Sequence, residues 1–264
     1  MKNPQGCASM QAFAISGIPA VKQGCDIGRL ILDAIAPMDL ALLPSDVFVI
    51  AQKIVSKAEG RTRQAGAIEA GPQARDIAAR SGKNAAKVQA ILDESSEILR
   101  VVDAPPDGIV IARHKAGWVC ANAGIDESNL GDELAADTLL LLPEDPDASA
   151  RGIAETIADA TGVRPGVIIS DTFGRPWRRG LLNVAIGVDG VVPIVDWVGK
   201  KDAYGRRLNV SQQALADEIA AASGLLMAKD AATPVILFRG IEWDRSASAR
   251  AVDYVRHPNE DLFK

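Results

Sequence analysis

Histidine and cysteine are scarce in this sequence, with two and three copies in 264 residues. A metal centre built mainly from histidine is excluded, because such sites need several imidazole or thiolate ligands close together. The three cysteines are scattered and odd in number, which is typical of a reducing compartment rather than of a disulfide framework. With so few histidines, nucleophilic catalysis through a Ser–His or Cys–His pair is poorly supported.

Long apolar runs and an excess of positive charge are also missing. No uninterrupted apolar segment is long enough to span a bilayer, and the N-terminus lacks the charged-then-apolar pattern of a signal peptide. The formal net charge of −5 argues against non-specific binding to nucleic acid or to anionic membranes. We therefore expect a cytoplasmic protein with neither nucleic-acid nor membrane partners.

Several nucleotide and hydrolase signatures are absent as well. The sequence contains no G-x-x-x-x-G-K-[ST] loop, no G-x-G-x-x-G after its first apolar run, no G-x-S-x-G and no H-E-x-x-H. Any nucleotide site must therefore be built without a P-loop.

Hydrophobic periodicity and turn residues predict alternating strands and helices. A helix is expected from Ile27 to Ile35, ended by Pro37, and another that ends at Thr161 with Gly162 as its stop. Strand, helix and strand in this order suggest a crossover unit around the second helix. Predicted strands cover residues 11–16, 46–51, 108–112, 138–142, 167–169 and 234–239.

Other elements rest on weaker signals. Residues 183–190 are predicted as a hairpin arm that turns at Asp189-Gly190, with 191–195 as its return. Ser211 is the expected cap of a helix carrying Leu215, Ile219, Ala222 and Leu226. A helical stripe is expected through Val88, Ile91, Leu92 and Leu99.

The strongest candidate site follows the apolar run 167–169. Asp171 and Thr172 stand at its end, and a loop with Arg175, Arg178 and Arg179 comes next. In open α/β sheets, ligands gather beyond the carboxyl ends of such strands. A carboxylate and a hydroxyl are hard oxygen ligands suited to Mg²⁺ or Mn²⁺. The alternative is that Asp171 caps a turn and the arginines are solvated.

Two further stretches offer polar groups of the same kind. Lys53 and Lys57 follow the strand 46–51, and point toward Asp171 if that strand is part of the sheet; otherwise they form a solvated basic face. Asp126, Glu127 and Asn129 follow a run of small residues, or else form an Asx turn. An oxygen-ligand metal site with basic residues around it suits chemistry on phosphates.

Several of these stretches together resemble the coenzyme F(420)-0:L-glutamate γ-ligase family. The similar segments are residues 52–60, 120–129, 170–180, 184–187, 196–206 and 216–220, and the likeness runs in order from about Gly17 to Gly240. The resemblance implies an α+β fold of mixed sheets and packed helices, in two tightly joined subdomains without a P-loop. It also implies an intertwined homodimer, with one ligase domain over residues 1–240. Residues 241–264 are polar, so we expect them to form a loosely held C-terminal segment.

The activity implied by the resemblance is GTP-dependent addition of L-glutamate to a deazaflavin coenzyme precursor. The terminal carboxylate becomes an acyl phosphate and the amine of glutamate attacks it, with later rounds joined by γ-linkage. Mg²⁺ or Mn²⁺, two per site, and K⁺ are the implied ions. A metal-dependent phosphohydrolase acting on a nucleotide or a phosphorylated small molecule, and a non-catalytic module that binds an acidic partner, remain alternatives.

Site residues carry over by position. The resemblance implies metal binding by Asp126, Asp171 and Thr172, and catalytic roles for Asp171, Arg175 and Lys57. The implied nucleotide-binding residues are Ile18, Pro19, Ala20, Val21, Gln52, Lys53, Lys57, Asn129, Ala228, Lys229, Asp230, Ala231, Ala232, Thr233 and Pro234. Lys229 stands where some members carry an acidic ligand for the second metal, and Asp230 is the candidate substitute.

Overall fold

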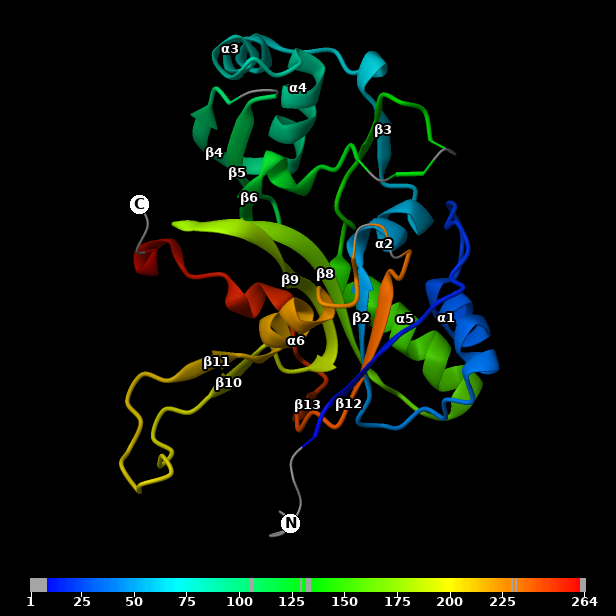
Figure 1. The fold of residues 1–264 in the computed structure, drawn as a ribbon. Helices are drawn as coiled ribbons and strands as arrows, with labels where there is room; N and C mark the ends of the chain where they lie inside the picture. Colours follow the sequence, from blue (N-terminus) through cyan, green and yellow to red (C-terminus); the bar gives the residue numbers. More distant parts are fainter. Residues whose placement is uncertain are drawn as a thin grey trace.

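A six-stranded mixed sheet forms the centre of the protein (Figure 1). The structure is a computed structural model and describes residues 9–104, 107–128, 130–131, 134–228, 230 and 232–261. Strands β2 and β8 are parallel, and every other neighbouring pair in this sheet is antiparallel. The sheet order is β1 (Gln11–Ala14), β12 (Val235–Arg239), β2 (Val47–Ala51), β8 (Gly166–Arg175), β9 (Arg178–Val191) and β13 (Arg245–Ser246). The expected α+β class is confirmed.

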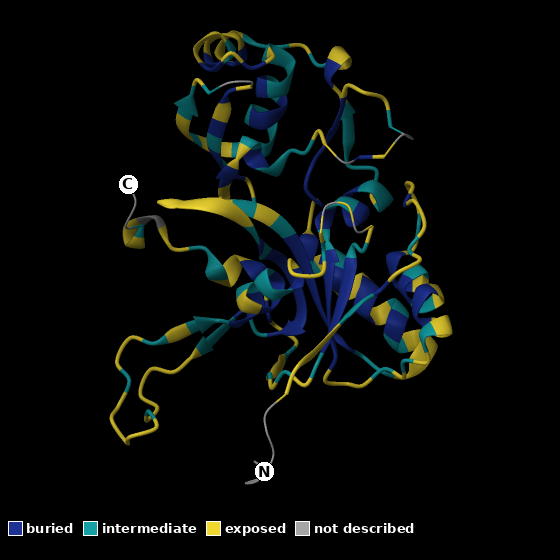
Figure 2. Ribbon diagram, in the orientation of Figure 1, coloured by how far each residue is buried: buried dark blue, intermediate teal, exposed yellow. Residues whose placement is uncertain are grey.

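Helices cover both faces of this sheet. α1 (Ile27–Ile35) and α5 (Pro146–Thr161) lie together on one side, and α6 (Leu215–Ser223) lies on the other (Figure 1). The carboxylate of Asp145 accepts a hydrogen bond from the N–H of Ala148 at the start of α5, and Gly162 ends that helix at φ 73°. Because both faces are covered, the central strands are buried along most of their length (Figure 2).

A smaller group of elements forms a second lobe. We define the small lobe as α3 (Pro72–Ser81), α4 (Ala85–Glu94), β4 (Ser95–Val102), β5 (Ile109–His114) and β6 (Val119–Ala121). It has a hydrophobic cluster of its own, separate from the cluster around the central sheet. The connection is a two-stranded sheet of β3 (Thr62–Gln64) and β7 (Thr138–Leu140).

Tertiary pairing overrides several predicted elements. Leu99 lies in β4, 38% exposed, and not on a helical stripe. β7 pairs with β3 and not with a strand of the central sheet, so the predicted crossover unit is wrong. Asp189-Gly190 lies inside β9, because the strand continues to pair with β8 and then with β13. The arginine loop is the end of the β8–β9 hairpin.

Two more predictions are corrected near the C-terminus. β10 (Ile194–Asp196) pairs with β11 (Gln212–Ala214), so Ser211 is not a helix cap, and Leu226 follows the end of α6. Residues 242–261 form a segment that is anchored to the body at several points and is not loosely held. Its Ala251 is fully buried, and its Trp243 donates a hydrogen bond to the carbonyl of Ser45. No helix in the described part of the chain has the length and apolar character needed to cross a membrane.

Candidate functional site

Two neighbouring parallel strands end at the same edge of the central sheet. Ala51, the last residue of β2, pairs with Ser170 of β8. α2 (Gln52–Ala58) begins directly after β2, and Asp171 comes directly after Ser170. Parallel pairing therefore brings the first turn of α2 beside Asp171, as the sequence predicts if residues 46–51 belong to the sheet.

A cavity of about 590 Å³ opens at this edge, which we call the main cavity. Its walls come from α2, β8, β9, the segment between β6 and β7, the segment after β1, and the segment before β12. The polar lining residues are Gln52, Lys53, Lys57, Asn122, Asp126, Ser128, Ser170, Asp171, Thr172, Asn183 and Thr233. This volume lies within the usual range for a small-molecule site.

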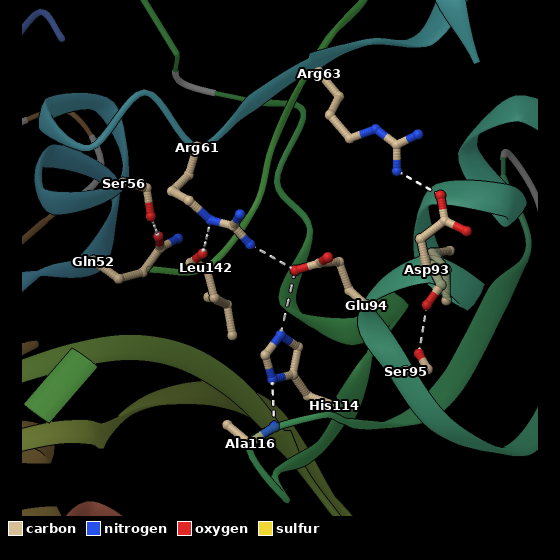
Figure 3. Close-up of polar contacts among 11 residues, drawn as sticks. Gln52, Ser56, Arg61, Arg63, Asp93, Glu94, Ser95, His114, Ala116 and Leu142 are labelled. Carbon is tan, nitrogen blue, oxygen red and sulfur yellow. Dashed lines mark hydrogen bonds and ion pairs between the residues drawn. The ribbon is translucent and has the colours of Figure 1, made fainter. Parts of the chain in front are cut away.

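The carboxylate of Asp126 is held by groups of α2. The amide nitrogen Nε2 of Gln52 donates to Oδ2 of Asp126 at 2.9 Å, and Nζ of Lys53 lies 3.3 Å from Oδ1. Lys53 also donates to the carbonyl of Ser128 at 2.8 Å. Ser56 donates to Oε1 of Gln52 at 2.8 Å, which fixes the orientation of that amide (Figure 3).

The surroundings of Asp171 make its carboxylate harder to ionise than one on the surface. Burial and the nearby charge of Asp126 raise the pKa of Asp171 to about 7, although Lys53 and Gln52 act in the other direction. Burial and the charge of Asp171 raise the pKa of the Cys120 thiol to about 12, which keeps this cavity-lining thiol neutral. Two carboxylates that share a cavity create a local demand for positive charge.

Thr172 is oriented by a residue that the sequence did not single out. Its hydroxyl lies 3.1 Å from Oδ1 of Asn183, the residue directly opposite on β9. Since that amide oxygen is only an acceptor, the hydroxyl proton points to Asn183 and the oxygen lone pairs remain for a ligand. Nδ2 of Asn183 in turn donates to the hydroxyl of Ser223 at 3.0 Å. Only the hairpin register reveals this contact.

The donor set of the main cavity fits a small divalent cation. No group of three or more histidine, cysteine, aspartate or glutamate residues able to hold a metal occurs within the described ranges. Asp126, Asp171 and the lone pairs of Thr172 supply hard oxygen donors instead. Mg²⁺ is usually held by one or two carboxylates, with water and substrate phosphates completing its shell, so these residues suffice for one such ion.

Most of the predicted nucleotide-binding residues line the same cavity. They are Ile18, Pro19, Ala20, Val21, Gln52, Lys53, Lys57, Ala228, Ala232, Thr233 and Pro234. Asp230 is exposed and is not part of the lining. Asn129, Lys229 and Ala231 lie outside the described residues, so their predicted roles stay predictions.

Arg175 is the one predicted catalytic residue that does not line the main cavity. It ends β8, and its Nη2 donates to the carbonyl of Arg179 at 3.0 Å across the hairpin end. Its guanidinium Nε is buried and has no hydrogen-bond partner among the described residues. A catalytic role for Arg175 stays a prediction.

The fold brings lysines and hard oxygen donors together in the main cavity, at the end of a parallel strand pair. Residues 17–240 match the family described as F420-0:gamma-glutamyl ligase. The chain therefore belongs to this family, whose members are enzymes of the ligase class.

Similar proteins occur in several organisms. The chain is 45% identical over 254 residues to a coenzyme F420:L-glutamate ligase of Methanothermobacter thermautotrophicus, covering 96% of this chain and 98% of the relative. It is 40% identical over 256 residues to the protein of that name from Archaeoglobus fulgidus, covering 97% and 96%. A third, from Methanopyrus kandleri, is 40% identical over 250 residues, covering 92% and 93%.

Proposed function

We propose that this protein is a GTP- and divalent-metal-dependent ligase that joins L-glutamate to the terminal carboxylate of a deazaflavin coenzyme precursor. The observation that carries the proposal is the joining of Asp126, Asp171, Thr172, Lys53 and Lys57 in one cavity of a chain that matches the family over most of its length. The names of the relatives support the acceptor and the amino acid, since each is a coenzyme F420:L-glutamate ligase.

The proposed reaction has two steps, phosphoryl transfer and amide formation. First, a carboxylate oxygen of the precursor forms a bond to the γ-phosphorus of GTP, the bond to the β-phosphate oxygen breaks, and GDP leaves. Then the amine of glutamate attacks the acyl carbon, the C–O bond to phosphate breaks, and inorganic phosphate leaves while the amine loses a proton. Further glutamates add by γ-linkage in the same way.

The residues of the main cavity have distinct roles in this proposal. Lys53 and Lys57 contact the phosphate oxygens, where positive charge offsets the charge that develops during transfer. Asp126, Asp171 and Thr172 hold a magnesium or manganese ion, which supplies charge neutralisation and alignment of the phosphates when bound. Residues 18–21 and 232–234 contact the nucleotide. A second metal and a potassium ion are part of the proposal without assigned ligands.

We also propose that the protein is a homodimer in the cytoplasm. The end of the β8–β9 hairpin and the arm between β10 and β11 extend from the body (Figure 1). These extensions expose large side chains, namely Trp177 at 84%, Leu181 at 59%, Tyr204 at 92% and Val210 at 88%. Apolar surface on projecting arms is commonly buried between subunits. Light scattering coupled to size exclusion tests this by giving one or two chain masses.

Mass spectrometry of the reaction products tests the activity. The purified protein is incubated with the deazaflavin precursor, GTP, Mn²⁺ and L-glutamate, and we expect products heavier by one or more glutamyl units with GDP released in step. Release of GDP without a glutamyl product would instead favour the phosphohydrolase. If no GDP is released and no product mass shifts, both enzymatic functions are refuted for these substrates.

A further inference from the structure

A second opening of about 260 Å³ lies beside the main cavity, and we call it the side pocket. It lies between β6, the β8–β9 hairpin, α6 and the C-terminal segment. Sites for drug-sized ligands are usually about 300–1,000 Å³. The side pocket is therefore suited to a smaller molecule than a nucleotide or a tricyclic ring. Its aromatic and charged lining residues are Arg113, Trp118, Phe173, Asp217, Tyr254, Arg256 and Asp261, of which Arg113 and Asp261 form an ion pair at 3.5 Å.

The side pocket and the main cavity meet along two strands. Phe173 of β8 lines both openings, and Asp171 stands two residues before it. Side chains two residues apart on a strand share a face and are separated by about 7 Å. On β6, Val119 lines the side pocket and the next residue, Cys120, lines the main cavity. The side pocket therefore adjoins the part of β8 that carries Asp171 into the main cavity.

Two polar groups of the side pocket lack a partner of the kind they need. The indole N–H of Trp118 is buried, in a residue that is 8% exposed, and meets no acceptor in the described part of the chain. The carboxylate of Asp217 accepts one hydrogen bond, from the N–H of Ala185 at 2.9 Å. No cationic side chain among the described residues forms an ion pair with it, and burial raises its pKa. The indole needs an anion or another acceptor, and the carboxylate needs a cation.

The rim adds further hydrogen-bond donors. The hydroxyl of Tyr254 accepts a hydrogen bond from the N–H of Asp217 at 3.0 Å, so its own proton is available to a ligand. Arg256 is exposed at the opening and forms no ion pair among the described residues. Phe173 and Val184 provide an apolar wall between these charges. Asp261 of this pocket is already paired with Arg113, so the pocket offers the carboxylate of Asp217, several donors and an apolar middle.

We propose that the side pocket binds L-glutamate, with its ammonium group at Asp217 and a carboxylate at the indole N–H of Trp118 and the guanidinium of Arg256. This assignment rests on the ligase function proposed above. An amino acid is the simplest ligand that carries both a cation and an anion on a short apolar stem. Because Phe173 lines both openings, glutamate bound here would lie next to the cavity proposed for acyl transfer.

Direct titration of L-glutamate tests the assignment without relying on turnover. Isothermal titration calorimetry is run on the full chain with Mg²⁺ and a non-hydrolysable GTP analogue, for wild type and the variants W118F and D217N. We expect the Kd for L-glutamate to rise about tenfold or more in each, because a hydrogen bond to a charged group contributes more than one factor of ten. The matched controls are W197F, on the β10–β11 arm, and R250Q, outside the pocket. Both should leave the Kd for L-glutamate unchanged.

A second ligand separates recognition from folding. Glutarate has the two carboxylates of glutamate and no ammonium group, so D217N should lose affinity for L-glutamate while keeping that for glutarate. A general structural defect would weaken both ligands and the GTP analogue together, and that result would overturn the assignment. So would an unchanged Kd for L-glutamate in both pocket variants, or no binding to wild type.

The product assay distinguishes failure of the pocket from failure of the function. Wild-type turnover with unchanged glutamate affinity in the variants would place glutamate elsewhere and leave the ligase intact. The expected titration result without any glutamyl product would retain the pocket and refute the ligase.

Discussion

Two ion pairs, Arg61–Glu94 and Arg63–Asp93, join the segment around β3 to α4 of the small lobe, and the first is the more buried, which makes Glu94→Gln an informative substitution. Nη2 of Arg61 lies 2.8 Å from Oε2 of Glu94, with side-chain exposures of 25% and 14%, and Nε of Arg61 donates to the carbonyl of Leu142 at 2.9 Å (Figure 3). Nε2 of His114 lies 3.8 Å from the same oxygen, and its Nδ1 accepts from the N–H of Ala116. The substitution keeps the shape and removes the charge.

The expected cost follows from the contacts of this pair. A hydrogen bond to a charged group contributes about 1.5–3 kcal/mol, and residual solvent access favours the middle of that range, about 2 kcal/mol. For a chain of this size, that loss lowers the Tm by about 4–6 °C. Because Leu142 packs on Gly124, two residues before Asp126, the KM for GTP should also rise.

The pH dependence has a defined sign. Burial of Glu94 opposes ionisation, but the contacts with His114 and Arg61 outweigh it and hold the pKa of this carboxyl below its ordinary value of 4.5. The stabilisation is therefore fully present above about pH 4.5 and is lost as the pH falls through the folded-state pKa. Wild type and E94Q should differ by a constant amount near neutrality and converge in acid.

Scanning calorimetry at several pH values, with Glu97→Gln as the matched control, measures this difference. Glu97 pairs with Arg113 on the same lobe, with Oε2 3.2 Å from the guanidinium Nε, and its side chain is 50% exposed. Such surface pairs contribute about 0–1 kcal/mol. Equal Tm shifts in E94Q and E97Q, or a difference that persists unchanged into acid, would refute the reasoning.

Three further predictions concern the site and the sheet. Asn183→Leu should lower Mn²⁺ affinity about tenfold, while Asn183→Asp should not, because it keeps an acceptor for Thr172. Manganese electron paramagnetic resonance measures both affinities, and equal losses would contradict the positioning role of Asn183. Asp171→Asn should abolish metal-induced thermal stabilisation, which for wild type reaches about 2.7 kcal/mol at one hundred times Kd; a retained shift would remove Asp171 from the metal site. Gly187→Ala should cost about 3 kcal/mol in urea unfolding, because a Cβ there would lie 2.5 Å from the backbone of Pro146; an unchanged midpoint would mean that α5 moves freely.

The centre of the main cavity could be predicted from local sequence. The buried strands ending at Ala51 and Ser170 have clear apolar patterns, and parallel strands direct the residues that follow them to one edge. Lys53, Lys57 and Asp171 could therefore be placed together before any coordinates were known. Asp126 was identified by its residue type and by the family resemblance, since nothing local fixes the return of its segment to α2.

Contacts that depend on long-range register were not predictable. Asn183 faces Thr172 because β8 and β9 pair over their length, with a register shift at Ile169/Ser170 that no local signal announces. The Asp189-Gly190 pair is a strong turn signal, but pairing with β8 on one side and β13 on the other keeps it in a strand. At Ser95, helix α4 passes into β4 without glycine or proline, so the helical stripe was extended too far.

The separate cluster of the small lobe has a consequence for how the protein opens. That cluster consists of three alanines, two valines and two isoleucines, namely Ala74, Ile77, Val88, Ile91, Val110, Ala112 and Ala123. It buries far less apolar surface than the cluster of the central sheet, so its amide protons should exchange through local opening at a lower free energy than global unfolding. The small lobe contributes one wall of the main cavity, through β6 and the segment that follows. A ligand bound in the main cavity should therefore slow amide exchange mainly in the small lobe, while exchange in the central sheet should change little.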